Sequence, residues 1–161
     1  MSKLQQITAD LEQRLPLLNI KKEQFESWQE DGTLEPGGRQ ETEQGVHLLD
    51  WKYRAVLCFE RIPARHAGLL LAFVQAWLDD NDPDRENRPL PSPEGQIDMD
   101  DKHKLADVEI TVEFIDPVYV VEDDNGLIDW DGRKWTFGTY DLWIAEAAVV
   151  GHNADLQEPA P

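Results

Sequence analysis

The amino-acid sequence predicts an α+β fold, a mostly antiparallel sheet with a helix packed on one face and an amphipathic helix at the N-terminus. Residues 46–62 alternate apolar and charged side chains, the period of two of a strand with one buried face. Residues 64–80 change to helical spacing and carry a wide apolar stripe. Residues 107–114 alternate again and predict a second long strand.

The chain opens with the amphipathic helix. Ser2 followed three residues later by Gln5 can form a capping box, and apolar residues then repeat at helical spacing up to Pro16. After this helix, Asp31-Gly32 is a turn signal between apolar residues, so residues 20–34 are expected to form a short strand or a loose hairpin.

The central strand is unusually long. If residues 46–62 are continuous, they span roughly 55 Å at about 3.3 Å per residue, far more than a typical strand of about 5 to 6 residues. Such a strand must bend or reach past its own domain to a neighbour. The helix that follows carries Trp77 on its apolar stripe and must pack against the strand. Cys58, the single cysteine, is expected to be a small buried hydrophobe.

Residues 81–104 are rich in proline and polar residues and are expected to form a long loop. The strand at 107–114 is interrupted by Asp116-Pro117, which predicts an edge or a bulge before it resumes at 118–121.

Two hairpin signals follow this strand. Asn125-Gly126 and Asp131-Gly132 each suit a primed turn, so residues 127–130 and 134–137 are expected to pair. Residues 140–150 form a last apolar run that suits a strand, although part of it also suits a helix. We expect one domain over residues 1–151 and a flexible tail over 152–161.

The net charge of the chain limits the kinds of molecule that it can bind. Asp and Glu number 33 against 15 Lys and Arg, a net charge of −18. A surface of that sign repels phosphate backbones and anionic lipid heads, so neither stable nucleic-acid binding nor membrane binding is expected. The N-terminus does not resemble a secretory signal, and the longest apolar run is too short for a membrane span, which predicts a soluble intracellular product.

No motif indicates an enzyme, a metal site or a cofactor. The four histidines are dispersed, no glycine-rich phosphate loop is present, and the cysteine has no histidine at a suitable spacing. The run from Asp80 to Asp84 resembles the start of a calcium loop, but Arg85 and Pro91 stand where that loop requires Gly and Glu. A solvated loop is the better interpretation.

The aromatic residues are the better lead. Trp51 and Trp77 fall on core-facing patterns, whereas Trp130, Trp135 and Trp143 lie in or beside the C-terminal hairpins, where exposed rings would mark a partner. The alternative is a second small core under the hairpins. Candidate interface residues are Trp51, Tyr53, Trp130, Trp135 and Trp143.

Three segments carry a family resemblance: Trp28–Gly32, Trp51–Leu57 and Leu70–Leu78. They resemble, in order and in aromatic positions, the tail completion protein R family of contractile-tailed temperate phages, and residues 2–121 follow that order. The resemblance implies a structural protein that caps the tail tube as a ring, most simply a homohexamer, and forms the surface joined to the head. Its implied partners are itself, the tail tube protein and head–tail joining proteins, in the host cytoplasm during assembly and then in the virion tail.

A ring through which DNA passes gives the acidic charge a role, because carboxylates offer phosphates no site at which to pause. The expected lumen-facing residues are Asp98, Asp100, Asp101, Glu122, Asp123 and Asp124. Alternatively, the charge only keeps a self-associating protein soluble. Two other functions stay open: a carbohydrate-binding β-rich module, suggested by the tryptophan-bearing hairpins, and an acidic DNA-mimic inhibitor.

Overall fold

The computed structural model describes residues 1–138. Two α-helices and seven strands follow one another, with short 3-10 turns between them. The elements are α1 (Lys3–Arg14), η1 (Leu15–Leu18), η2 (Lys22–Gln24), β1 (Phe25–Pro36), β2 (Glu41–Thr42), β3 (Gly45–Pro63), η3 (Ala64–His66), α2 (Ala67–Asn81), η4 (Pro83–Asn87), β4 (Glu94–Asp100), β5 (Leu105–Glu122), β6 (Ile128–Trp130) and β7 (Arg133–Phe137). The apolar run at 140–150 and the tail at 152–161 lie outside the described residues.

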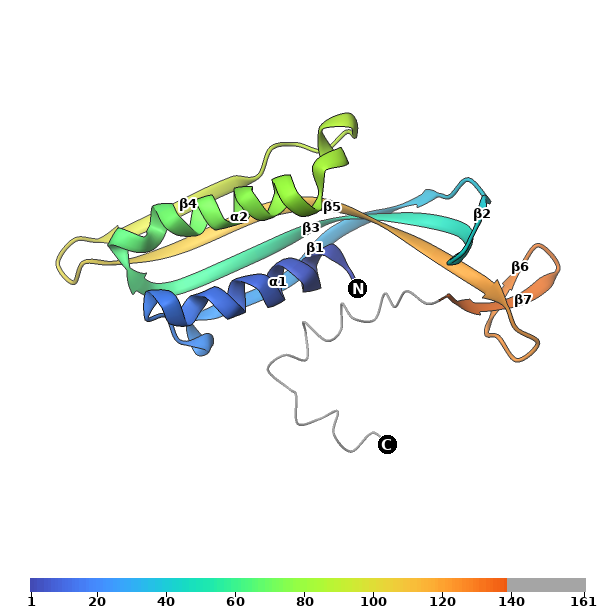
Figure 1. The fold of residues 1–161 in the computed structure, drawn as a ribbon, viewed down its shortest axis with the longest axis horizontal. Helices are drawn as coiled ribbons and strands as arrows, with labels where there is room; N and C mark the ends of the chain where they lie inside the picture. The colour runs from blue at the N-terminus through green and yellow to red at the C-terminus, as the bar shows by residue number, and fades with distance from the viewer. Residues whose placement is uncertain (139–161) are drawn as a thin grey trace.

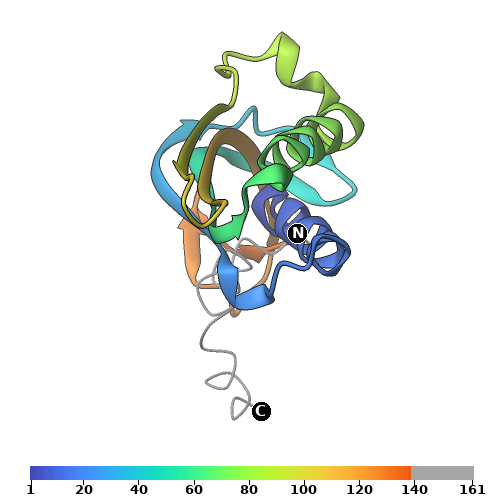
Figure 2. The same cartoon turned by 90° about the vertical axis from the view of Figure 1, so that its left-hand side faces the viewer.

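All strand pairs are antiparallel, in the order β1-β3-β5-β7-β6, with β2 paired to the start of β3 and β4 paired to the start of β5. Both helices lie on the same face of the sheet, side by side (Figure 1). The sheet curls, and the helices lie in its hollow, as the view along the molecule shows (Figure 2). The predicted α+β class is confirmed.

The core forms where the helices cover the sheet, a part that we call the body. Alternate residues of β3, among them Tyr53, Leu57 and Phe59, point toward the helices and are buried. Phe59 stacks on Phe25 of β1 with ring centroids 4.5 Å apart. Trp77 of α2 is 7% exposed and meets Phe114 of β5 edge to face at 6.1 Å. The predicted packing of strand and helix is therefore confirmed.

Beyond the body, the sheet continues without helices. β3 has 19 residues and β5 has 18. The N-terminal part of β3 and the C-terminal part of β5 extend past both helices (Figure 1). We call this part the arm: residues 30–36, 45–52 and 115–122, ending in β2, β6 and β7. No residue of 45–52 is fully buried, and all of residues 30–36 are exposed. The long strand is confirmed, and it does leave the helix-covered part of its own chain.

Of the three turn predictions, the first is wrong, the second is right only in part and the third is confirmed. Asp31-Gly32 makes no hairpin; it lies in a β-bulge within the continuous strand β1, where the register shifts between Gln29 and Gly32. Glycine is needed there because a Cβ would lie 2.4 Å from the ring of Trp51. Asp131-Gly132 has positive φ at both residues, 55° and 72°, and is the expected primed turn between β6 and β7.

Asn125-Gly126 is a turn, but not a primed one, because neither residue has a positive φ. It is closed by the Gly126 amide, which donates to the Asp123 carbonyl over 2.7 Å. Pro117 lies on the stretch of β5 between the partners β4 and β7, and a register shift in β3 follows close by. The expectation of an edge or a bulge at Pro117 is therefore consistent with the pairing.

The expected loop over residues 81–104 is wrong in part, because it contains a strand. α2 runs to Asn81, η4 follows, and β4 pairs with β5 over its whole length. β4 escaped prediction because six of its seven residues are exposed and the seventh is half-buried, so neither face imposes an alternation.

The N-terminus of α1 is fixed to the sheet by a buried carboxylate. Asp116 of β5 is 2% exposed and accepts a 2.6 Å hydrogen bond from the hydroxyl of Tyr53. That hydroxyl accepts one from the amide of Leu4 at 3.2 Å, and Lys3 Nζ lies 3.5 Å from the carboxylate. The Ser2 hydroxyl caps the helix, as predicted, by accepting from the amide of Gln5. A negative charge at a helix N-terminus is favourable.

Burial raises the pKa of Asp116, against the opposing effects of the Tyr53 hydrogen bond and of Lys3. The contribution of this group to stability is therefore fully present below the unfolded pKa of about 3.9 and is lost as the pH rises through the folded pKa. We expect Asp116→Asn to resemble the wild type at low pH and to gain in free energy of unfolding relative to it as the pH rises. Urea unfolding from pH 4 to pH 8 measures the difference.

The same replacement at exposed Asp84 measures the effect of removing one surface charge. A difference between wild type and Asp116→Asn that stays constant with pH, or changes in the opposite sense, contradicts the assignment.

Candidate functional site

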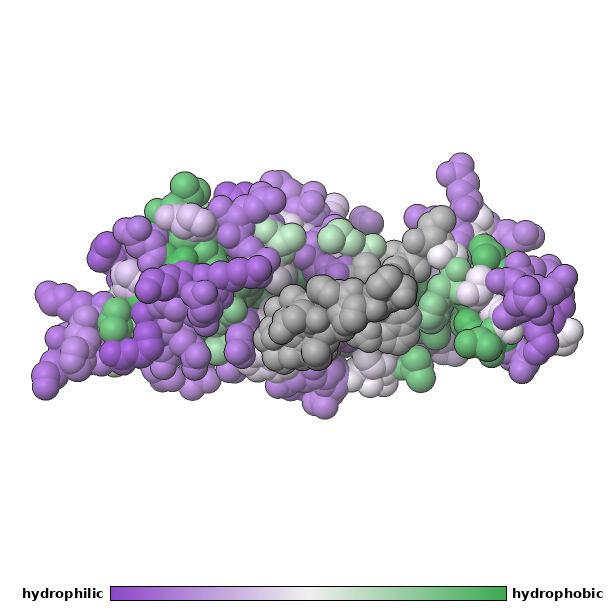
Figure 3. All heavy atoms as spheres, turned by 90° about the horizontal axis from the view of Figure 1, so that it is seen from below, coloured by the Kyte–Doolittle hydropathy of each residue, from purple (hydrophilic) through white to green (hydrophobic). Residues whose placement is uncertain are grey.

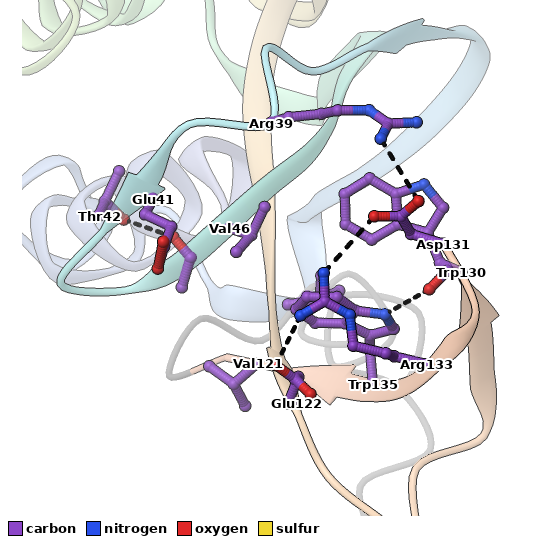
Figure 4. Close-up of a pocket in the computed structure, with 12 residues that line it drawn as sticks. Arg39, Glu41, Thr42, Val46, Val121, Glu122, Trp130, Asp131, Arg133 and Trp135 are labelled. Carbon is purple, nitrogen blue, oxygen red and sulfur yellow. Dashed lines mark hydrogen bonds and ion pairs between the residues drawn. The ribbon is translucent and has the colours of Figure 1, made fainter.

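The end of the arm holds a pocket of about 340 Å³. It is lined from the β1–β2 connection, from β2, from the start of β3, from the end of β5 and from the β6–β7 hairpin (Figure 4). Its walls include the rings of Trp130 and Trp135, whose centroids are 5.2 Å apart. Trp135 Nε1 donates a 2.8 Å hydrogen bond to the carbonyl of Trp130 and so fixes one ring against the strand that carries the other.

Two arginines tie the hairpin to its surroundings. Arg133 lies 2.9 Å from Glu122 and 3.5 Å from Asp131, with its guanidinium over the ring of Trp135. Arg39, from the β1–β2 connection, lies over Trp130 and 3.9 Å from Asp131. Each pair is exposed and contributes about 1 kcal/mol or less. The arrangement positions the hairpin; it does not leave a free cation in the pocket.

The predicted aromatic interface residues fall into three groups. Tyr53 is 2% and Trp135 4% exposed, so neither ring is available to a partner, and that expectation is wrong for both. Trp51 and Trp130 are half-buried and keep part of a ring in solvent. Trp51 Nε1 donates to Gln29 Oε1 at 2.9 Å. Trp143 lies outside the described residues.

Trp135 is buried at the arm's end, where Val118 and Val120 of β5 are buried as well. None of the three belongs to the cluster that forms the core of the body. The small second core under the hairpins, the alternative to an exposed tryptophan surface, is therefore present. Because Trp135 is buried in this second core, its ring cannot belong to the exposed aromatic platform that a carbohydrate-binding module would need.

The six predicted lumen residues do not lie together. Asp98 and Asp100 are on strand β4 and Asp101 begins the following turn, so the expectation that the three share a loop is wrong. Glu122 ends β5 and is followed by the turn with Asp123 and Asp124, at the other end of the molecule (Figure 1). Asp100 pairs with His103 and Arg61, and the hydrogen bonds from His103 chiefly lower its pKa.

A carboxylate surface that sequence reasoning missed covers the face of the sheet opposite the helices. We call it the acidic face. It is made by the outward alternates of β1, β3, β4 and β5, all exposed: Glu26, Glu60, Glu94, Asp98, Asp107 and Glu109. Asp98 and Asp107 stand directly opposite each other, and like charges in that position are destabilising. The charged residues that alternate with apolar ones in these strands, and by which the strands were predicted, could also have predicted this surface.

Cys58 lies within the acidic face, opposite Glu26 on one side and Glu109 on the other. Partial burial and the nearby carboxylates of Glu60, Glu109, Glu26 and Asp107 raise the pKa of its thiol to about 11. The thiol is half-buried, where a fully buried one was expected, and it is protonated at neutral pH, which does not suit a nucleophile.

Several large apolar side chains are exposed on the described surface. Leu34 is 70%, Leu127 96% and Val121 38% exposed on the arm, and Leu17 is 76% exposed on the body. Hydrophobic residues are visible at both ends of the molecule (Figure 3). Within residues 1–138, no three His, Cys, Asp or Glu side chains are grouped so as to hold a metal ion. No helix of the described part is long and apolar enough to span a membrane.

Comparison with known proteins gives two matches of high coverage. The family model of the P2 phage tail completion protein R (GpR) matches residues 1–139. The chain is also similar to a protein of Haemophilus phage HP1 (strain HP1c1), described as an uncharacterized 19.2 kDa protein in the rep-hol intergenic region. The two are 32% identical over 158 residues, which cover 96% of this chain and 93% of the phage protein. No solved structure matches.

The opposed carboxylates of the acidic face make a stability prediction. We expect Asp98→Lys to raise the free energy of unfolding by about 0.2 to 1 kcal/mol, because the repulsion from Asp107 becomes an attraction. Thermal or urea unfolding measures it. Glu94→Lys is the matched control, since it makes the same change of charge on the same strand opposite the neutral Thr111. A loss of stability in Asp98→Lys alone would mean that the two carboxylates do not repel.

Proposed function

The chain belongs to the P2 phage tail completion protein R (GpR) family, and from this premise we propose that its copies form a ring, most simply of six, that caps the tail tube. Membership supports a role in tail completion, a location in the virion tail and interaction with other tail components. The proposal adds the ring, its contact with the tube protein, and a surface joined to the head through head–tail joining proteins. The protein acts in it as a structural component, not as an enzyme, and assembles in the host cytoplasm.

The observation that carries the proposal is the arm. A ribbon of strands with no covering layer is marginally stable by itself. In the arm, Leu34, Leu127 and Val121 are exposed and no helix of the described residues covers them, whereas the helices of the body bury the apolar alternates of β3, among them Leu57 and Phe59. A neighbouring copy supplies the missing layer in a ring, and the contact buries these side chains.

Imaging tests the ring. Negative-stain micrographs of the purified protein with tail tubes are expected to show capped tube ends. Leu34→Asp with Val121→Asp should remove the caps, because both changes place a charge on the arm's apolar surface. Leu17→Asp is the matched control, since Leu17 is as exposed as Leu34 but lies on the body. Uncapped tubes with the wild-type protein, or normal caps with the arm variant, would overturn the proposal.

We further propose that the acidic face lines the channel of the ring. Asp98, Asp107 and Glu109 are exposed on neighbouring strands, and a wall of carboxylates gives a passing phosphate backbone no site for release of counterions. Asp100 suits this role less well, because Arg61 and His103 compensate its charge. The turn with Asp123 and Asp124 lies too far along the molecule to belong to the same wall (Figure 1).

Asp98→Lys combined with Glu109→Lys tests the channel. We expect rings to assemble normally while DNA delivery into the host slows, because DNA pauses at the new cations. The rate of DNA entry after adsorption is the measurement. Asp84→Lys with Glu86→Lys makes the same change of charge on η4, away from the acidic face. Unchanged delivery with lysines at 98 and 109 refutes a channel-lining role.

A further inference from the structure

Strand β5 has an open stretch on the side away from β3. β4 pairs with β5 as far as Thr111, and β7 pairs with it from Val120 onward. No strand of the described residues pairs with residues 112–118 on that side, although β3 pairs with them on the other. This stretch lies where the body passes into the arm, between β4 and β7 (Figure 1). We call residues 112–118 the open edge.

The backbone of the open edge points outward at Glu113 and Ile115. The Glu113 carbonyl accepts a hydrogen bond from the Arg85 guanidinium at 3.1 Å. The Ile115 carbonyl accepts one from Lys3 Nζ at 2.6 Å. The amide of a strand residue points to the same side as its carbonyl, so both amides face the open edge too. On that side, neither amide has an acceptor within residues 1–138.

The unpaired amide of Ile115 calls for a partner. Ile115 is only 5% exposed, and a buried backbone amide without an acceptor costs free energy. Lys3 and Arg85 serve the two carbonyls, but a cation cannot accept a bond from an amide. A neighbouring strand offers both a donor and an acceptor at each such position.

β7 leads the chain into the open edge. It is antiparallel to β5, which runs into the arm, so β7 runs from the arm back toward the body. Val120 stands opposite Phe137, and the next residue, Gly138, donates its amide to the Tyr119 carbonyl at 2.9 Å. This bond extends the ladder past the end of β7. In the same register, residues 139–145 stand opposite residues 118–112 and end where β4 begins to pair.

The sequence after Gly138 suits an added strand. Tyr140, Trp143 and Ile144 are residue types that strands favour. The register places Leu142 opposite Ile115 and Ile144 opposite Glu113, the two positions whose amides lack acceptors. The similarity to the Haemophilus phage HP1 protein covers 96% of this chain and therefore includes this segment.

The pairing also has costs. Pro117 has no amide to donate, so one bond of the new ladder is missing. Asp141 falls opposite the buried carboxylate of Asp116, although Lys3, whose Nζ lies 3.5 Å from that carboxylate, offsets part of the repulsion. Lys3 and Arg85 must release the carbonyls that they hold. Until then they protect the edge from foreign strands, as charged side chains do on other sheets.

We propose that residues 139–145 extend β7 along the open edge of β5 in the same copy of the chain, in the register that Gly138 begins. Main-chain hydrogen bonds hold the added strand, and the amides of Glu113 and Ile115 gain acceptors. The extension carries a continuous ladder across the passage from body to arm and fixes the direction of the arm. It does not depend on the proposed ring.

Disulfide formation tests the register in the full-length chain. In a Cys58→Ser background, Glu113→Cys is combined with Ile144→Cys. A hydrogen-bonded antiparallel pair has Cα atoms about 5.5 Å apart, within the range of a disulfide. The matched controls combine Glu113→Cys with Trp143→Cys or with Ala145→Cys, whose side chains point to the other face. We expect the pair at 113 and 144 to oxidise on the order of tenfold faster than either control.

Gel electrophoresis without reductant shows which copy is linked. Monomers with an internal disulfide at 113 and 144 support the proposal. Equal oxidation of all three pairs, no oxidation of any, or covalent dimers in place of linked monomers would overturn it.

Hydrogen exchange tests the pairing without a change at the open edge. In the wild-type protein, the amides of Glu113 and Ile115 are expected to exchange at least about tenfold more slowly than in Leu142→Pro, which breaks the added ladder. His152→Pro, beyond the added strand, is the control and should exchange like the wild type. The amide of Phe114, which points toward β3, shows that each variant is folded. Unchanged exchange at Glu113 and Ile115 in folded Leu142→Pro refutes the added strand.

Discussion

The architecture depends on a mismatch of lengths. An extended residue advances about 3.3 Å along a strand, whereas a helical residue advances about 1.5 Å along its axis. β3 has 19 residues, α1 has 12 and α2 has 15, so the strand is roughly three times as long as either helix. Helices that lie side by side on one face cannot cover such a sheet from end to end. One part of the sheet therefore has the main core, and the other part is an arm without helices whose buried residues, among them Val118, Val120 and Trp135, lie outside that core.

The boundary between the two parts is set by Asp116. Its carboxylate lies on β5, the strand that continues into the arm, and it is bonded to Tyr53 on β3 and placed at the N-terminus of α1. A buried charge is costly, and the hydrogen bond from Tyr53 and the nearby cation of Lys3 offset the cost for Asp116 only in part, since its pKa remains raised. The same group thus connects the two long strands to each other and to α1, which begins there. A boundary fixed in this way gives the arm a defined start.

Much of the fold was predictable because burial differs between the faces of an element. The alternation in β3 and β5 and the stripe in α2 follow from one covered side, and Asp131-Gly132 follows from local backbone geometry. β4 was missed because both of its faces are exposed. Asp31-Gly32 was misassigned because turns and bulges use the same residues, and the ring of Trp51 that explains Gly32 lies on another strand. The burial of Trp135 likewise depends on β5, a partner that local sequence does not identify.

For the candidate surfaces, only the sign of the charge was predictable from the sequence. A net charge of −18 indicates repulsion of phosphates, but it does not say that carboxylates gather on one face of the sheet. That distribution follows from topology. Every second residue of β1, β3 and β5 is apolar and points toward the helices, so the charged residues between them share the other face. Antiparallel pairing then places Asp98 opposite Asp107. It also places Glu26 and Glu109 on either side of Cys58. Such pairs cost stability in the isolated chain. The folding of a single copy does not require them, whereas the proposed channel-lining role does.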